Sequence, residues 1–228
     1  MTDYVFPSTA DLAKSDAYIQ SILDPHGDPA LEAATQNRQA NGLPEISAGL
    51  QFGKFLKLTA QAVNAKRILE IGTLGGYTAI WLARALPEGG KLITLEISDK
   101  HAKVARENID RASLSSKVEV KVGPAINTLK TLNPDEPFDL VFIDADWESV
   151  RVYFNEAKRL ARKGAAIVID NVNYDAKVAL EPEDTKEAYI RSIKGLLDQL
   201  KEDKEVDVTI LGIAEYRRFD GLLYAIKQ

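Results

Sequence analysis

The sequence predicts an α/β fold in which an open, mostly parallel sheet carries helices on both faces. Short runs rich in β-branched and other apolar residues recur along the chain, and segments with the apolar spacing of amphipathic helices lie between them. Strands that alternate with helices pair in parallel through right-handed crossovers. The chain has 228 residues, 45% of them apolar, so residues 1–228 are expected to bury one large core as a single domain.

The first 66 residues show no strand pattern and are expected to form a helical cap on the sheet. Apolar residues stand at helical spacing over residues 10–23, 30–40 and 47–64. Residues 67–228 are then left for the core of strands and helices.

Five parallel strands are expected over residues 67–71, 91–96, 118–122, 138–144 and 165–170. Helical spacing is present between them over residues 78–86, 99–112 and 150–161. The stretches 140–143 and 165–169 are almost continuously apolar, which favours central strands that are buried on both faces.

Two further strands are expected near the C-terminal end, over residues 206–213 and 222–226. Residues 214–221 connect them, and a link of this length favours an antiparallel hairpin. Residues 174–184 form the one polar segment between elements that is long enough to serve as a lid.

Charge and cysteine content exclude several classes of function. The chain has 29 Lys and Arg against 34 Asp and Glu, and a net charge of −5 argues against nucleic acid or acidic membranes as partners. It contains no cysteine, which excludes disulfides, thiolate nucleophiles and Cys-ligated metals and favours the reducing cytoplasm. Residues 1–7 lack a signal-peptide pattern, and no apolar run approaches a membrane span. A small molecule is therefore the expected partner.

A glycine-rich turn follows the first strand and opens a helix. Ligands of open parallel sheets bind at the carboxyl ends of the strands, where glycines allow a tight turn and close approach of the backbone. Glu96 ends the second strand, 20 residues past Gly76, where nucleotide-binding folds place an acid on ribose hydroxyls. Leu74 stands where the dinucleotide pattern would have its second glycine, so a pyrophosphate is disfavoured but the cofactor remains open.

Acidic and amide side chains end the fourth and fifth strands. Asp144, Asp146 and Asp170 are expected to cluster with Asn171, because neighbouring parallel strands bring their ends together. Three clustered carboxylates would repel one another, and oxygen ligands suit a hard cation such as Mg²⁺ or Ca²⁺. The alternative is that these acids cap helices or face water. Two histidines, His26 and His101, make no metal-spaced pair and are expected to be solvated.

Motifs spread over nearly the whole chain resemble the cation-dependent, S-adenosylmethionine-dependent O-methyltransferases, the family of catechol and caffeoyl-CoA O-methyltransferases. The resemblance is carried by residues 15–17, 64–66, 69–73, 75–78, 123–125, 138–146, 170–171 and 220–222. It implies a seven-stranded, Rossmann-like methyltransferase sheet, mostly parallel, with an antiparallel C-terminal hairpin. It also implies S-adenosylmethionine as cofactor, a phenolic acceptor and a homodimer.

The resemblance also implies roles for individual residues. Glu96 would bind the ribose, Asp146 would hold the amino group of the cofactor, and the divalent cation would be held by Asp144, Asp170 and Asn171. The remaining cofactor-binding positions would be Ser47, Glu70, Gly72, Thr73, Gly76, Tyr77, Thr78, Gly123, Pro124 and Ala125, with Asp144 beside them.

The catalytic residues implied are Asp144, Trp147 and Glu215, and one of them departs from the family pattern. Trp147 stands where relatives usually have a lysine base, while Glu215 resembles an acid near the second hydroxyl of catechol acceptors. Tyr174 and Phe219 are candidates, with Trp147, for a flat aromatic pocket. Two alternatives stay open: a cofactor-binding protein with weak catalysis, and a nucleotide-dependent oxidoreductase.

Overall fold

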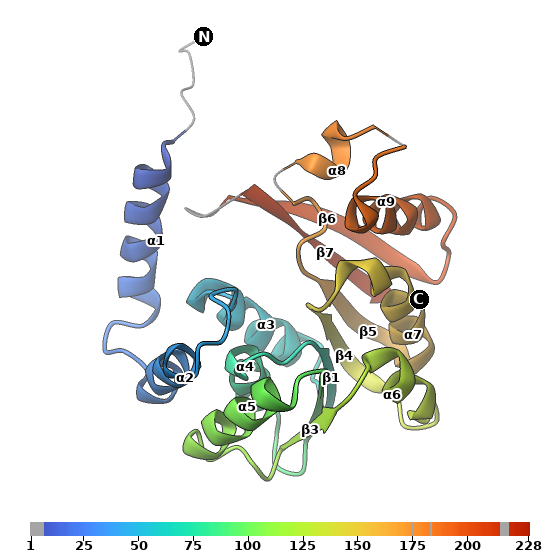
Figure 1. Ribbon diagram of the computed structural model, residues 1–228. Coiled ribbons are helices and arrows are strands. Elements are labelled where there is room, and N and C mark those ends of the chain that lie inside the picture. The colour runs from blue at the N-terminus through green and yellow to red at the C-terminus, as the bar shows by residue number, and fades with distance from the viewer. Residues whose placement is uncertain (1–6, 175, 183, 215–218) are drawn as a thin grey trace.

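A seven-stranded sheet in the order β3-β2-β1-β4-β5-β7-β6 forms the centre of the computed structural model (Figure 1). The structure describes residues 7–174, 176–182, 184–214 and 219–228. Strands β1 to β5 are parallel, whereas β7 is antiparallel to both β5 and β6. The strands are β1 Arg67–Ile71, β2 Lys91–Glu96, β3 Val118–Val122, β4 Phe138–Ile143, β5 Ala161–Ile169, β6 Val206–Ala214 and β7 Phe219–Lys227.

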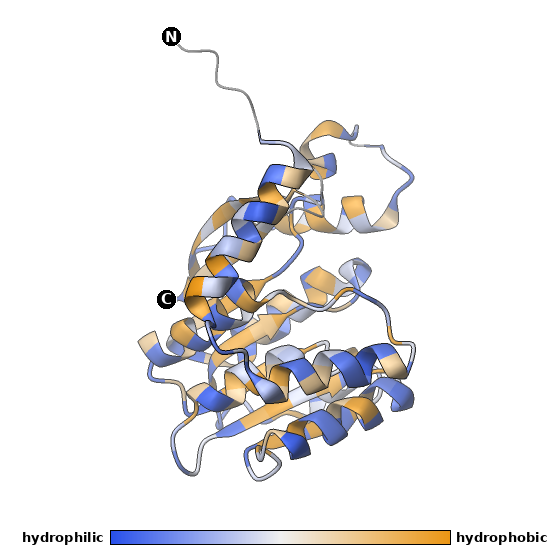
Figure 2. Cartoon of the chain, turned by 90° about the vertical axis from the view of Figure 1, so that its left-hand side faces the viewer, coloured by the Kyte–Doolittle hydropathy of each residue, from blue (hydrophilic) through white to orange (hydrophobic). Residues whose placement is uncertain are grey.

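Helices cover both faces of this sheet and bury two apolar cores. Successive residues of β1 show the division, because Ile68 lies in one core while Leu69 and Ile71 lie in the other. The helices are α1 Thr9–Leu23, α2 Pro29–Ala40, α3 Leu50–Ala62, α4 Tyr77–Ala85, α5 Asp99–Arg111, α6 Ala125–Thr131, α7 Val150–Leu160, α8 Lys177–Leu180 and α9 Ala188–Leu200, with the 3₁₀ turn η1 Trp147–Ser149. Figure 2 shows hydrophilic residues along the outer helices and hydrophobic ones along the strands.

The predicted fold class is confirmed, with differences at particular elements. Strand β5 begins at Ala161, four residues before the predicted start, because Ala161 pairs with Phe138 ahead of a register shift. Helices α6 and α9 were not predicted. The segment predicted as a polar loop over residues 174–184 contains the short helix α8.

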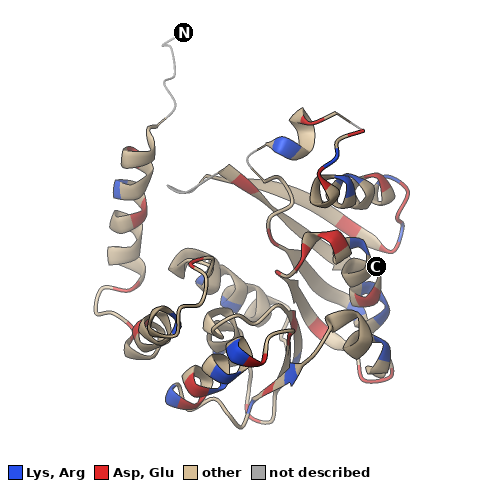
Figure 3. Cartoon of the chain, viewed as in Figure 1, with Lys and Arg blue, Asp and Glu red and all other residues tan. Residues whose placement is uncertain are grey.

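The N-terminal helices differ in how they contact the core. Helix α3 packs on α4 and α2 packs on α5, whereas α1 has no buried residue and stands at one side of the molecule in Figure 1. Basic and acidic residues are mixed along α5 in Figure 3. In the described part of the chain, no helix has the length and apolar character needed to cross a membrane.

Candidate active site

A cavity of about 530 Å³ opens at the carboxyl ends of β1, β2 and β4, within the usual size range of small-molecule sites. Twelve of the residues predicted for the site line it, namely Ser47, Gly72, Thr73, Tyr77, Thr78, Glu96, Pro124, Ala125, Asp144, Asp146, Trp147 and Asn171. Gly76, Gly123, Glu70 and Asp170 flank this lining without being part of it. Glu215 lies outside the described residues.

The turn after β1 depends on glycine at one position for a steric reason. Gly72 has φ of +100°, and a Cβ atom added there would lie 1.8 Å from the carbonyl oxygen of Asp144. The turn can therefore approach the end of β4 only because position 72 has no side chain. Gly76 follows at φ of +79° and caps the start of α4.

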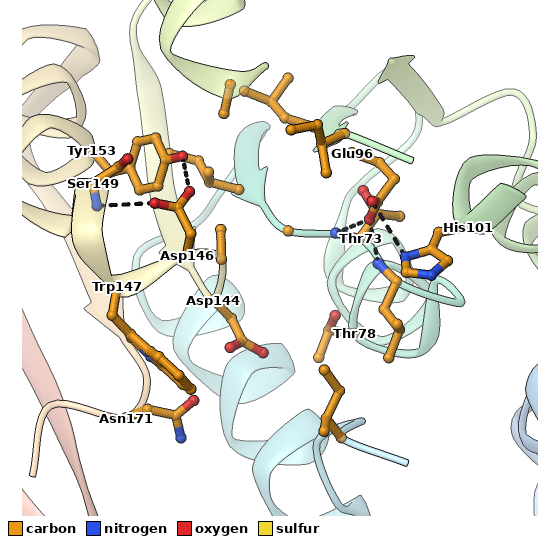
Figure 4. Close-up of a pocket in the computed structure, with 18 of the residues that line it drawn as sticks. Thr73, Thr78, Glu96, His101, Asp144, Asp146, Trp147, Ser149, Tyr153 and Asn171 are labelled. Atoms are coloured by element: carbon orange, nitrogen blue, oxygen red, sulfur yellow. Dashed lines mark hydrogen bonds and ion pairs between the residues drawn. The ribbon is translucent and has the colours of Figure 1, made fainter. Parts of the chain in front are cut away.

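Glu96 is buried at the end of β2 and binds the glycine-rich turn directly. Its Oε2 accepts hydrogen bonds from the backbone amides of Thr73, at 3.3 Å, and Leu74, at 2.8 Å. Its Oε1 accepts from the amide of Ser98 at 2.9 Å and lies 3.4 Å from Nδ1 of His101 (Figure 4). His101 therefore belongs to the cavity wall, contrary to the prediction that it is simply solvated.

Glu70 lies beneath the cavity floor and is fully buried. Thr78 donates a hydrogen bond from its hydroxyl to Oε1, whereas the buried Oε2 has no hydrogen-bond partner. Burial raises the pKa of Glu70 to about 8, a shift that the Thr78 bond opposes only in part. The Glu70 carboxyl is therefore mainly protonated at neutral pH, and its contact with the cavity runs through Thr78.

Asp146 is turned away from the other strand-end acids. It accepts hydrogen bonds from the hydroxyl of Tyr153 and, at 3.0 Å, from the amide of Ser149, as Figure 4 shows. Burial and the neighbouring Asp146 carboxylate raise the pKa of Tyr153 to about 12. The prediction that Asp146 clusters with Asp144 and Asp170 is wrong, because these bonds hold it on the other side of the strand end.

Asp144, Asp170 and Asn171 do follow adjacent strand ends, as predicted. Ile143 and Ile169 are paired in register, and the amide of Asp170 donates to the carbonyl of Ile143 at 3.0 Å. Over the described ranges, no three His, Cys, Asp or Glu side chains come together as a cation cluster. The candidate donor set is thus two carboxylates and one amide, all of them hard oxygen ligands.

Three aromatic rings pack together next to η1, and one of them, that of Trp147, lines the cavity. The ring centroids of Trp147 and Tyr174 are 5.1 Å apart, those of Tyr174 and Tyr189 are 5.1 Å apart, and those of Trp147 and Tyr189 are 5.9 Å apart. We call Trp147, Tyr174 and Tyr189 the aromatic wall. Tyr189 is the second residue of α9 and was not predicted for the site, although apolar residues at helical spacing farther along this segment indicate a helix there.

The sequence matches the O-methyltransferase family over residues 26–227. It is 46% identical over 213 residues to a Niastella koreensis protein named catechol O-methyltransferase, covering 92% of this chain and 95% of that protein. A Mycobacterium tuberculosis protein of the same name is 45% identical over 211 residues, which cover 92% of this chain and 94% of the relative.

A solved structure is similar over almost the whole chain. The O-methyltransferase from Bacillus cereus, in complex with SAH (S-adenosylhomocysteine), superimposes with a TM-score of 0.92 at 37% identity. The superposition covers 96% of this chain and all of that one, at 100%. The order of elements around the cavity is therefore that of a protein which binds this compound.

Proposed function

The chain belongs to the O-methyltransferase family, and on that premise we propose that it transfers a methyl group from S-adenosylmethionine to a hydroxyl of an aromatic vicinal diol, with a divalent cation. The observation that carries the proposal is that one cavity is lined by the glycine-rich turn with Glu96, by oxygen donors and by Trp147 of the aromatic wall. The acceptor class comprises catechols, flavonoids and hydroxycinnamoyl compounds. The family assignment favours methyl transfer over the oxidoreductase alternative.

The glycine-rich turn and the acids around it suit a positively charged methyl donor. We assign the ribose hydroxyls to Glu96 and the donor's amino group to Asp146, because both carboxylates line the cavity. Pro124 and Ala125 offer a short apolar surface for a flat base. The absence of a side chain at Gly72 lets the turn approach the end of β4, so that the turn and Asp144 line the same cavity.

The residues at the ends of β4 and β5 fit a divalent cation by their chemistry. Asp144, Asp170 and Asn171 would hold it with two carboxylates and an amide oxygen, a set that Mg²⁺ and Ca²⁺ accept. When bound, such a cation lowers the pKa of a hydroxyl placed beside it.

The chain itself orients the acceptor and excludes water. Trp147, which packs against Tyr174, provides a flat surface for an aromatic ring next to Asp144. The acceptor oxygen bonds to the methyl carbon as the bond from carbon to sulfur breaks, and the hydroxyl proton leaves to solvent or a nearby group. No lysine lines the cavity in the described part of the chain, so proton removal proceeds without that family base.

Methyl transfer to catechols, flavonoids and hydroxycinnamoyl thioesters, measured with Mg²⁺ and with EDTA, tests the proposal. Mg²⁺ is expected to restore the activity that EDTA removes, and Asp170→Ala is expected to abolish activity while the fold remains intact. Full activity after dialysis against EDTA would refute the cation dependence. Binding of S-adenosylhomocysteine without methyl transfer to any acceptor would favour the alternative of a binding protein with weak catalysis.

We also propose that the chain forms a homodimer, for which α1 supplies a face. Tyr18 and Ile22 on this helix are 69% and 59% exposed, and α1 has no buried residue. Exposed apolar side chains on a helix without buried residues are typical of a contact surface. Light scattering is expected to give twice the mass of one chain, and replacement of both residues by Asp is expected to give the monomer. A monomeric wild-type protein would refute this proposal.

A further inference from the structure

Asp220, the second residue of β7, is a buried carboxylate beside the end of β5. It is 6% exposed, and both of its oxygens accept hydrogen bonds. Oδ1 accepts from the backbone amides of Gly221 at 2.7 Å, Tyr174 at 2.9 Å and Asn173 at 3.3 Å. Oδ2 accepts from Nδ2 of Asn171 at 3.0 Å. One side chain thus binds three residues of the segment that follows β5.

The bond to Asn171 determines which way that amide points. An ionised carboxylate can only accept hydrogen bonds, so the nitrogen of the Asn171 amide must face Asp220 and its oxygen must face the opposite side. Figure 4 shows this oxygen turned toward Asp144 and the nitrogen turned away. Asn171 is 4% exposed and lines the cavity, so its oxygen is presented beside the strand-end acids.

The backbone that Asp220 holds is in an unfavourable conformation. Asn171 and Tyr174 have φ of +63° and +43°, in the left-handed region that side chains disfavour. The close approach of β7 adds a steric condition, because a Cβ atom at Gly221 would lie 2.8 Å from the Cβ of Asn173. The hydrogen bonds to Asp220 compensate for this conformation and direct Tyr174 into the aromatic wall.

We propose that Asp220 is a positioning residue that orients the Asn171 amide oxygen toward the divalent cation and holds Tyr174 in the aromatic wall. The cation part of this inference rests on the proposed function. Partners of this kind, which orient a metal ligand without touching the metal, contribute about 10-fold to 100-fold to metal affinity.

The replacement Asp220→Asn tests the inference because it keeps the shape of the side chain. The new amide oxygen can still accept from the three backbone amides, but its nitrogen would face that of Asn171. Asn171 must then turn over and present nitrogen to the cation. Titration calorimetry with Mg²⁺ alone is expected to show about 10-fold to 100-fold weaker binding. Asp207→Asn, at an exposed position on the adjacent strand β6, is the matched control and is expected to bind as the wild type does.

A double variant that exchanges the side chains of positions 171 and 220 provides the decisive test. In Asp220→Asn combined with Asn171→Asp, the carboxylate at position 171 accepts from the new amide and still presents an oxygen to the cation. This double variant is expected to recover Mg²⁺ affinity to within a few-fold of the wild type, and to fold even where the single variant does not. Thermal unfolding of each variant without Mg²⁺ shows whether a variant is folded, so that weaker Mg²⁺ binding is not mistaken for a loss of folding.

Two results would overturn this inference and leave the proposed function standing. One is wild-type Mg²⁺ affinity in a folded Asp220→Asn variant, and the other is a double variant that fails to fold or fails to recover Mg²⁺ affinity. Absence of Mg²⁺ binding in the wild type would overturn the cation dependence of the proposed function and the orienting role with it. Methyl transfer is not needed for any of these measurements.

Discussion

Burial of Glu70 makes the stability of the protein depend on pH in a predictable direction. The pKa of this carboxyl is about 8 in the folded protein, against 4.5 for an exposed glutamate, and desolvation is the largest cause. Between these two values the unfolded chain loses the proton while the folded protein keeps it. The free energy of unfolding then falls by about 1.4 kcal/mol for each pH unit. The stabilising proton is fully present below pH 4.5 and its contribution is lost as pH rises to about 8.

Glu70→Gln removes this titration, since a neutral amide of similar shape replaces the protonated carboxyl. Between pH 5.5 and 7.5 the variant is expected to gain about 2–3 kcal/mol in stability relative to the wild type, from two pH units at up to about 1.4 kcal/mol each. Urea unfolding in EDTA, without methyl donor, measures both proteins at both pH values. Glu119→Gln is the control, because Glu119 is an exposed strand residue with a side-chain exposure of 60%. A Glu70→Gln variant whose stability changes with pH as the wild type does would refute the reasoning.

Three further changes test the turn, the ribose contact and the missing base. Gly72→Ala is expected to destabilise the protein by about 2–5 kcal/mol in urea unfolding, because backbone strain and overpacking add at this site. Gly89→Ala is the control for backbone strain alone, because Gly89 has φ of +74° and a Cβ atom added there would have no atom within 4 Å. Glu96→Ala is expected to weaken S-adenosylmethionine binding in calorimetry by about 1.5–3 kcal/mol, and unchanged affinity would remove Glu96 from the site. Trp147→Lys is expected to shift the pH profile of kcat toward lower pH on one catechol, because burial beside the cation site lowers the pKa of the new amine. An unchanged profile with a raised KM would mean that Trp147 contributes packing only.

Local sequence patterns were sufficient for the strands that build the site. Residues such as Glu96 and Asp144 end apolar runs, and strand ends of a parallel sheet share one edge, so their place at the cavity follows from the runs themselves. The orientation of Asp146 could not be predicted from these runs, because it depends on a hydrogen bond from Tyr153 in helix α7.

Contacts between distant elements account for what the sequence did not reveal. Asp220 lies 49 positions from Asn171, and the two meet only because β7 pairs with β5. Helix α6 has seven residues, of which Leu129 alone is buried, so its periodicity is too weak to recognise. The apolar residues Ile190, Ile193 and Leu196 of α9 do stand at helical spacing and were a usable signal.

The position of β7 between β5 and β6 also has a consequence for synthesis of the chain on the ribosome. Strands β1 to β5 can pair as they emerge, but β6 is made before the strand that joins it to the sheet. Until β7 is released, β5 keeps an open hydrogen-bonding edge, the kind of edge that invites aggregation. Because Asp220 is carried by β7, the segment after β5 also lacks its central acceptor until that moment. Closure of the sheet and completion of the site are therefore one late event in the maturation of the nascent chain.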